Sequence, residues 1–146
     1  MLIPLASALR IYGVCLLALG HFSEALAQLQ ESASHFRALA DTPMYPAMEE
    51  LEVELKLGMC LTALGRPPEA AEHFRAGLDV LRALAVSESG LQPALAPYLA
   101  QMSDQLLDFR QSPVLTASAA LLTQILDRSA EILGHLGWHD TAEQIT

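Results

Sequence analysis

The sequence predicts an all-α protein: a right-handed α-solenoid of three antiparallel helical hairpins, with six main helices and a short C-terminal segment. First, Leu16–Gly20 followed by Glu24-Ala25 returns 45 residues later as Leu61–Gly65 followed by Glu69-Ala70. Second, the chain is 52% hydrophobic but only 5% aromatic, so helix-favouring Ala and Leu must build most of the core. Third, apolar residues recur at steps of three and four, and no segment alternates like a strand.

The repeat organises the 146 residues as one domain, with units at about 1–43, 44–89 and 90–136 and a tail at 137–146. A displacement of 45 also pairs Gly13 with Gly58 and Cys15 with Cys60. The third copy is degenerate and has Arg110 where the turn glycine is expected. Residue 1 falls close to a repeat boundary, as in a segment of a longer solenoid. Such repeats stack around one continuous core.

In the first unit, two helices are predicted around a turn at Gly20, because glycine adopts the backbone conformation that ends a helix. Ser23 is the expected N-cap of the second helix. The apolar stripe of the first helix is Leu9, Tyr12, Leu16 and Leu19, and that of the second is Leu26, Leu29, Ala33, Phe36 and Ala40.

In the second unit, prolines mark the helix starts, since proline at the first helical position costs no hydrogen bond. Pro43 and Pro46 precede the third helix, and Pro67-Pro68 begin the fourth. The stripe of the third helix is Leu57, Leu61 and Leu64, and that of the fourth is Ala70, Phe74, Leu78, Leu81 and Ala85.

In the third unit, a connector at Ser87–Gly90 precedes a fifth helix, and Pro113 is expected to begin a sixth that ends near Leu136. The stripe of the fifth helix is Leu95, Leu99, Met102, Leu106 and Phe109, and that of the sixth includes Leu122, Ile125 and Leu133. Trp138 follows; we expect its segment to cover the open end of the stack, the alternative being an interface anchor.

Charge and composition exclude several classes of protein. Seventeen acidic against eight basic residues give a net charge of −9, so no basic patch is expected and nucleic-acid binding is disfavoured. Cys15 and Cys60 are interpreted as small buried hydrophobic residues. No apolar run reaches the roughly 18 residues of a membrane span. The signal-like stretch Ile11–Gly20 aligns with an internal helix of the next repeat, so we expect a soluble, cytoplasmic protein.

The residues of the repeat resemble the tetratricopeptide repeat, in which a small residue in the first helix, a turn glycine and an early alanine in the second helix recur. Gly13, Gly20 and Ala25 match in the first copy, and Gly58 and Gly65 match in the second, together with Ala70 and Phe74. The period of 45 exceeds the usual 34 or so and resembles the long repeats of kinesin light chains and of sensor arms of signal-transducing ATPases and transcription activators. The resemblance implies a protein-binding scaffold whose concave groove is lined by first helices.

The predicted groove is apolar with acidic edges. Because the chain contains no asparagine, the carboxylate clamp that some members of the family use is not expected. An amphipathic partner helix or peptide with basic flanks suits the surface better. Two alternatives stay open: Leu17, Leu55 and Met59 pack against neighbouring helices, and Glu49, Glu50, Glu52 and Glu54 form a solvated helix face. The candidate contact residues are Arg10, Val14, Leu17, Glu52, Leu55, Met59, Thr62, Asp104 and Asp108.

No constellation of catalytic residues is evident, and we expect neither an enzyme nor a bound metal or cofactor. His135 and His139 are four residues apart, but Gly137 interrupts their helix, so they are interpreted as surface residues. Two other functions stay open. One is a ligand-sensing arm of a larger signalling ATPase or transcription regulator. The other is a structural segment that self-associates through apolar end faces, such as the one around Leu5.

Overall fold

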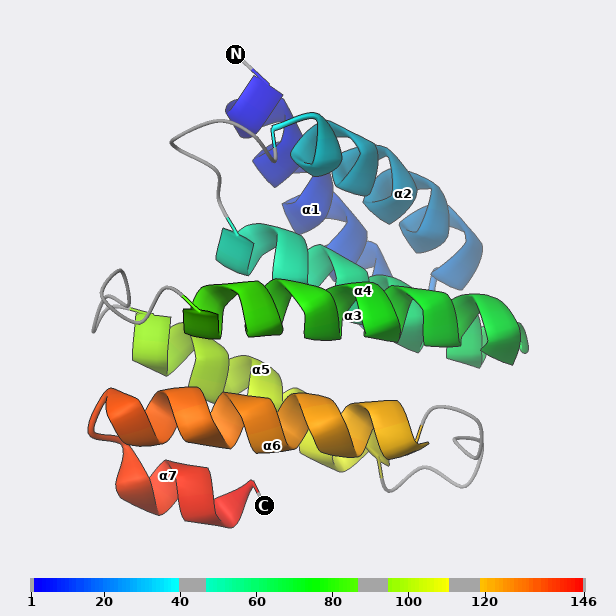
Figure 1. Cartoon of the computed structure of the whole chain (residues 1–146). Helices are drawn as coiled ribbons and strands as arrows, with labels where there is room; N and C mark the ends of the chain where they lie inside the picture. The colour runs from blue at the N-terminus through cyan, green and yellow to red at the C-terminus, as the bar shows by residue number, and fades with distance from the viewer. Residues whose placement is uncertain (1, 40–46, 87–94, 111–118, 146) are drawn as a thin grey trace.

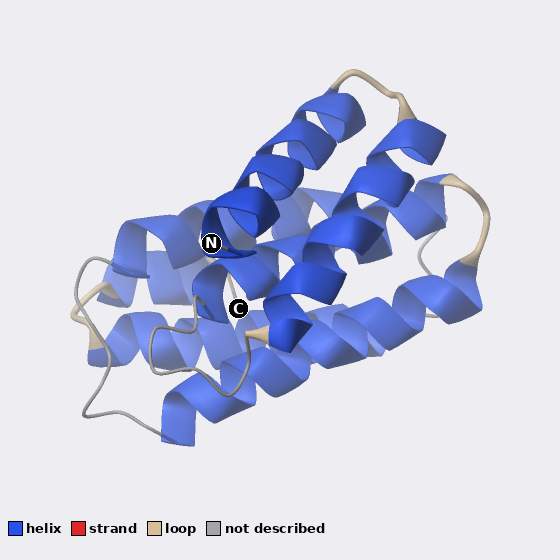
Figure 2. Cartoon of the chain, turned by 90° about the horizontal axis from the view of Figure 1, so that it is seen from above, coloured by secondary structure: helices blue, strands red, loops and turns tan. Residues whose placement is uncertain are grey.

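The computed structural model describes residues 2–39, 47–86, 95–110 and 119–145, and within them every regular element is an α-helix (Figures 1 and 2). The predicted all-α class is therefore confirmed for this part of the chain. Ala40, Pro43, Pro46, the connector Ser87–Gly90 and Pro113 lie outside the described residues. The helices are α1 (Leu2–Ala18), α2 (Phe22–Ala38), α3 (Ala47–Ala63), α4 (Pro67–Val86), α5 (Leu95–Arg110), α6 (Ala119–His135) and α7 (His139–Gln144).

Neighbouring helices pack in pairs that also contact the next pair. The most extensive packing joins α1 to α2 and α3 to α4, and α2 then lies against α3 (Figure 1). Further along the chain α6 packs against both α4 and α5, and the short α7 covers part of α6. The first helices of successive pairs also contact one another: α1 packs against α3, and α3 packs against α5. The chain is thus a repeat-like assembly of helices.

Three turns share one geometry, set by glycine. Gly20, Gly65 and Gly137 have φ of 80°, 74° and 90°, the left-handed conformation that other residues rarely adopt. After each glycine, the next amide reaches back five residues: His21 to Leu16 O at 2.9 Å, Arg66 to Leu61 O at 2.8 Å and Trp138 to Leu133 O at 2.8 Å. With the bond from each glycine amide three residues back, this is the Schellman ending of a helix.

The third such turn joins α6 to α7 and lies outside the 45-residue register. A strict step of 45 places it at Arg110, the last residue of α5, and the residues after Arg110 are not described. The same turn geometry recurs at Gly137, 72 residues after Gly65. The segment from Leu136 to Ala142 is therefore a third Leu-Gly turn followed by a helix. The segment after Leu136 was expected to cover the open end of the stack, and in the structure its helix α7 packs on α6.

Two helical glycines bring the paired helices together. A Cβ atom on Gly13 would lie 2.6 Å from Leu29 Cγ, and one on Gly58 would lie 2.5 Å from Phe74 Cε1. Both distances are too short for real side chains. Leu29 and Phe74 are fully buried. The small residue in each first helix therefore provides the space that the large residue of the following helix fills.

The predicted apolar stripes of α2 to α6 form the core. Buried residues of these stripes include Leu26, Leu29, Ala33, Phe36, Leu57, Leu61, Ala70, Phe74, Leu78, Leu81, Leu99, Met102, Leu106, Leu122, Ile125 and Leu133. The stripe of α1 is partly wrong: Leu16 is buried, but Tyr12 is 53% and Leu19 72% exposed. Cys15 is exposed as well, so only Cys60 is the buried cysteine that was expected. Among the described helices, α1 packs mainly against α2 and less extensively against α3.

The glutamates of α3 do not form the solvated face that one reading predicted. Glu54 is 1% exposed, and its carboxylate accepts hydrogen bonds from Arg37 Nη2 at 2.9 Å and pairs with His73 Nδ1 at 2.8 Å. Glu50 is 7% exposed. Burial, the nearby Glu54 charge and, in the opposite sense, Arg37 leave the pKa of Glu50 above its ordinary value. Of the four glutamates, Glu50 and Glu54 are therefore buried between helices, and Glu49 and Glu52 are partly exposed.

Glu50→Gln is expected to stabilise the protein at pH 7 by about 1 kcal/mol. A carboxyl group whose pKa is higher in the folded state opposes folding at neutral pH. This cost is lost as the pH falls through the folded pKa towards 4.5, the ordinary value. The gain should therefore be present at pH 7 and absent near pH 4 in urea titrations. Glu72→Gln, at an exposed position of α4, is the matched control; an equal gain from both variants would contradict the argument.

Candidate functional site

The candidate site is an open pocket of about 450 Å³ that lies mainly between the helices α1, α3 and α5. We call it the α1–α3–α5 pocket. Its lining is mainly apolar, and its polar groups are Lys56 and Gln105. Three predicted contact residues, Val14, Leu17 and Met59, meet here. The lining residues are Val14, Leu17 and Ala18 of α1, Phe22 of α2, Lys56, Met59 and Ala63 of α3, and Gln105 and Phe109 of α5.

The repeat explains why these residues meet. Val14 and Met59 occupy equivalent positions, as do Ala18 and Ala63, so α1 and α3 present the same faces to the pocket. Because Ala18 and Ala63 have small side chains, they leave room beside the larger side chains of Val14 and Met59. On α5, Phe109 lines the pocket, and the centre of its ring lies 6.2 Å from that of the buried Phe74 of α4.

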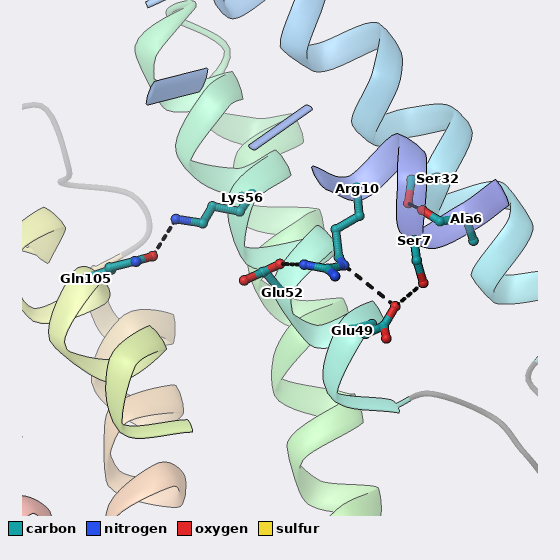
Figure 3. Close-up of polar contacts among 8 residues, drawn as sticks. All are labelled: Ala6, Ser7, Arg10, Ser32, Glu49, Glu52, Lys56 and Gln105. Atoms are coloured by element: carbon teal, nitrogen blue, oxygen red, sulfur yellow. Dashed lines mark hydrogen bonds and ion pairs between the residues drawn. The ribbon is translucent and has the colours of Figure 1, made fainter. Parts of the chain in front are cut away.

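Lys56 is the cation of the pocket. Its side chain is nearly buried, and its ammonium group donates a hydrogen bond to Gln105 Oε1 across the gap between α3 and α5 (Figure 3). Burial lowers the pKa of Lys56, and the carboxylate of Glu52 opposes this effect. An ammonium group has three donors. Lys56 can therefore offer a further hydrogen bond to a group that enters the pocket.

The predicted acidic edge near the start of α3 is occupied by partners within the chain. Arg10 pairs with Glu52 through Nη1 and lies 3.6 Å from Glu49 through Nε, while Ser7 donates to Glu49 (Figure 3). Arg10 is therefore a link between α1 and α3. Glu52 belongs to the same link.

Asp104 and Asp108, at the other predicted edge, are exposed on α5. They lie one helical turn apart and flank Gln105 and Phe109 of the pocket in sequence. These two carboxylates are the exposed candidate residues that give this side of the molecule a negative charge.

The remaining candidates, Leu55 and Thr62, are buried. Leu55 is 3% exposed, and its Cδ2 atom would be 3.0 Å from a Cβ on Gly77 of α4. Thr62 donates to Gly58 O at 2.8 Å within α3. Leu55 therefore has the packing role that the sequence left as its alternative, and Thr62 is buried with its hydroxyl bonded within α3.

Sequence reasoning did not find Phe22, Lys56, Gln105 or Phe109 as pocket residues. A signal existed for Lys56, which is three residues before Met59 and seven before Ala63, and so shares their face of α3. No comparable signal identified Gln105. The position of Gln105 in the pocket depends on how closely α5 approaches α3. The spacing of residues along one helix does not show this distance.

Two other depressions offer less to a partner. One of about 450 Å³ lies over α4 and α6 and is lined by Leu78 and the polar residues Arg82, Gln124, Asp127, Arg128 and Glu131, of which Arg82 bonds to Gln124 and Arg128 to Glu131. The other, of about 380 Å³, is the solvent-exposed turn at 137–141. In the part of the chain that the structure describes, no three His, Cys, Asp or Glu side chains gather as metal ligands would.

Comparison of the chain with protein-family models, curated proteins and solved structures gives no significant match. In the described ranges, none of the helices combines the length and the apolar character needed to cross a bilayer.

Proposed function

We propose that the protein is a cytoplasmic interaction scaffold that binds a partner helix or peptide in the α1–α3–α5 pocket. The observation that carries the proposal is the convergence of Val14, Leu17 and Met59, from two repeats, on one open apolar surface. An exposed apolar depression with few polar groups is typical of a binding site.

The fold that we propose around this pocket is a short right-handed array of tetratricopeptide-like hairpins. Three glycine turns with the same hydrogen bonds support it. The glycine-to-large-residue contacts of α1 with α2 and of α3 with α4 support it as well. In such an array the first helices face the ligand, and these are the helices that contribute most of the pocket.

The partner that we propose is an amphipathic helix with basic flanks. Apolar side chains at three- and four-residue spacing would enter between Val14, Met59 and Phe109. Basic flanking residues would approach Asp104 and Asp108, which are exposed beside the pocket. An acidic or amide group of the partner could accept a hydrogen bond from Lys56 at the centre.

Met59→Glu is expected to abolish most of this binding, because it places a carboxylate in the apolar part of the pocket. The probe is a phage-displayed library of 16-residue peptides selected on the whole chain. The enriched peptides should carry an apolar helical stripe and lysine or arginine flanks. Fluorescence polarisation should give a dissociation constant at least about 30-fold weaker for Met59→Glu.

Ser34→Glu is the matched control, since it adds the same charge at an exposed position of α2. Helicity and melting temperature of both variants should equal those of the parent protein. Failure to enrich any peptide, or equal affinity for the parent and Met59→Glu proteins, would rule out the pocket as the binding site.

The ligand-sensing arm is the second candidate, and the pocket volume favours it. About 450 Å³ lies within the range of small-molecule sites, roughly 300–1,000 Å³. Lys56 and Gln105 would then orient a small anionic ligand. A screen of small carboxylates by thermal shift separates the two candidates: stabilisation that is lost in Lys56→Met would support the sensor.

A further inference from the structure

A second apolar surface lies on a different face of α1. Its side chains repeat at alternating steps of three and four, the spacing of a coiled-coil seam. All of them are exposed: Leu5 by 45%, Tyr12 by 53% and Leu19 by 72%, with Ala8 and Cys15 exposed between them. We call Leu5, Ala8, Tyr12 and Cys15 of α1, together with Leu19 of the turn that follows, the α1 heptad stripe.

The next repeat shows what this face is built to do. The corresponding positions of the next repeat are Glu50, Val53, Leu57 and Cys60 of α3 and Leu64 of the turn that follows it. The first four are buried and Leu64 is partly buried. Cys60 donates through its Sγ atom to Phe22 O at 3.0 Å, so part of this face packs on the start of α2. The face of α3 that is equivalent to the exposed stripe of α1 is therefore a surface on which other helices pack.

We propose that the α1 heptad stripe is a self-association surface on which α1 of a second copy packs antiparallel about a two-fold axis. Large residues (Leu5, Tyr12, Leu19) alternate with small ones (Ala8, Cys15) along the stripe. In antiparallel pairing, large side chains of one copy lie over small side chains of the other, which allows two helices to approach closely. An isologous pair of this kind is closed and uses one stripe per copy.

Charge favours this stripe over other surfaces as the place where two copies meet. The chain carries a net charge of −9, so most surfaces of two copies repel each other. The described helix α1 contains a single charged residue, Arg10, and Arg10 is engaged by Glu49 and Glu52. The α1 heptad stripe itself carries no charge. Two copies can therefore meet here without bringing like charges together.

The inference is independent of the proposed peptide binding. The stripe uses Leu5, Tyr12 and Leu19, whereas the α1–α3–α5 pocket uses Val14 and Leu17 on another face of the same helix. Either site can fail its test without affecting the other.

The test is the oligomeric state of the whole chain by light scattering and sedimentation equilibrium. A concentration-dependent dimer is expected, and Tyr12→Glu should weaken it by about 100-fold or more, because two carboxylates would face apolar surface. Trp138→Glu is the control: Trp138 is 37% exposed at the α6–α7 turn, and this variant should dimerise like the parent. Should Tyr12→Glu lose helicity, Leu19→Glu, at a more exposed position, replaces it.

Labelling of Cys15 gives an independent readout. Cys15 is exposed and Cys60 is buried, so a maleimide should react first at Cys15. Its labelling rate should fall as the protein concentration rises, and should stay constant in Tyr12→Glu. A monomer at all concentrations, a dimer that Tyr12→Glu leaves intact, or an open series of oligomers that Trp138→Glu disrupts would each overturn the proposal.

Discussion

Phe74→Ala is expected to lower the free energy of unfolding by about 3–5 kcal/mol, the range measured for large-to-small replacements of buried aromatic residues. Phe74 is fully buried, lies against Gly58 of α3 and is stacked at a tilt beside Phe109 of α5. Its ring thus contacts two neighbouring helices besides its own. Urea unfolding followed by circular dichroism measures the loss, and a loss below about 1 kcal/mol would contradict this packing.

A second substitution tests the cause of that loss. Gly58→Ala alone should destabilise, since the new Cβ would lie 2.5 Å from the Phe74 ring. In the Phe74→Ala background the same change should become neutral or stabilising, because the obstruction is gone and alanine favours helix. Gly134→Ala is the control: it lies within α6 with no atom within 4 Å of a Cβ, so it should stabilise in both backgrounds.

The helices could be predicted from the sequence because their signals are local. Glycine turns, prolines at helix starts and three-four apolar spacing each act within a few residues. The third turn was missed because a strict 45-residue step points to Arg110, whereas Leu136-Gly137 with Ala142 repeats the turn residues at another distance. A search for the turn motif itself, without a fixed period, finds it.

Whether a side chain of α1 or α3 is buried depends on which helices pack beside it. The sequence pattern of one helix does not show which neighbours it has. Tyr12 and Leu57 occupy equivalent positions, yet Tyr12 is 53% exposed and Leu57 is fully buried. The pattern of one helix cannot distinguish the two cases. The same limit applies to the site: Val14, Leu17 and Met59 were predicted from register, but Leu55 and Thr62 share that register and are covered.

The buried charges of α3 could not be predicted either, since their partners come from other helices. Arg37 of α2 and His73 of α4 both reach Glu54 from sequence distances of 17 and 19 residues. A run of glutamates in isolation is typical of a solvated face. Once Arg37 of α2 supplies a counter-charge and His73 of α4 a hydrogen-bond partner, Glu54 can lie inside.

Removing both partners of Glu54 should therefore destabilise the protein by about 3–5 kcal/mol, because a carboxylate that is 1% exposed would lose its counter-charge. The variant is Arg37→Met with His73→Leu, which retains apolar volume around the carboxylate. Arg37 is 54% exposed and His73 only 19%, so each single change should cost less than the pair. Thermal and urea unfolding give the three values.

Glu54→Gln in the doubly substituted protein should recover most of that stability, since it removes the uncompensated charge and keeps the shape of the side chain. In the parent protein the same Glu54→Gln change should destabilise, because it removes two charge-assisted contacts. The effect of Glu54→Gln on the free energy of unfolding should thus have opposite signs in the two backgrounds. A residue that contributes only by packing would not show this reversal. If Glu54→Gln has the same effect in both backgrounds, then Arg37 and His73 do not compensate its charge, and the joining of α2, α3 and α4 must come from the apolar core alone.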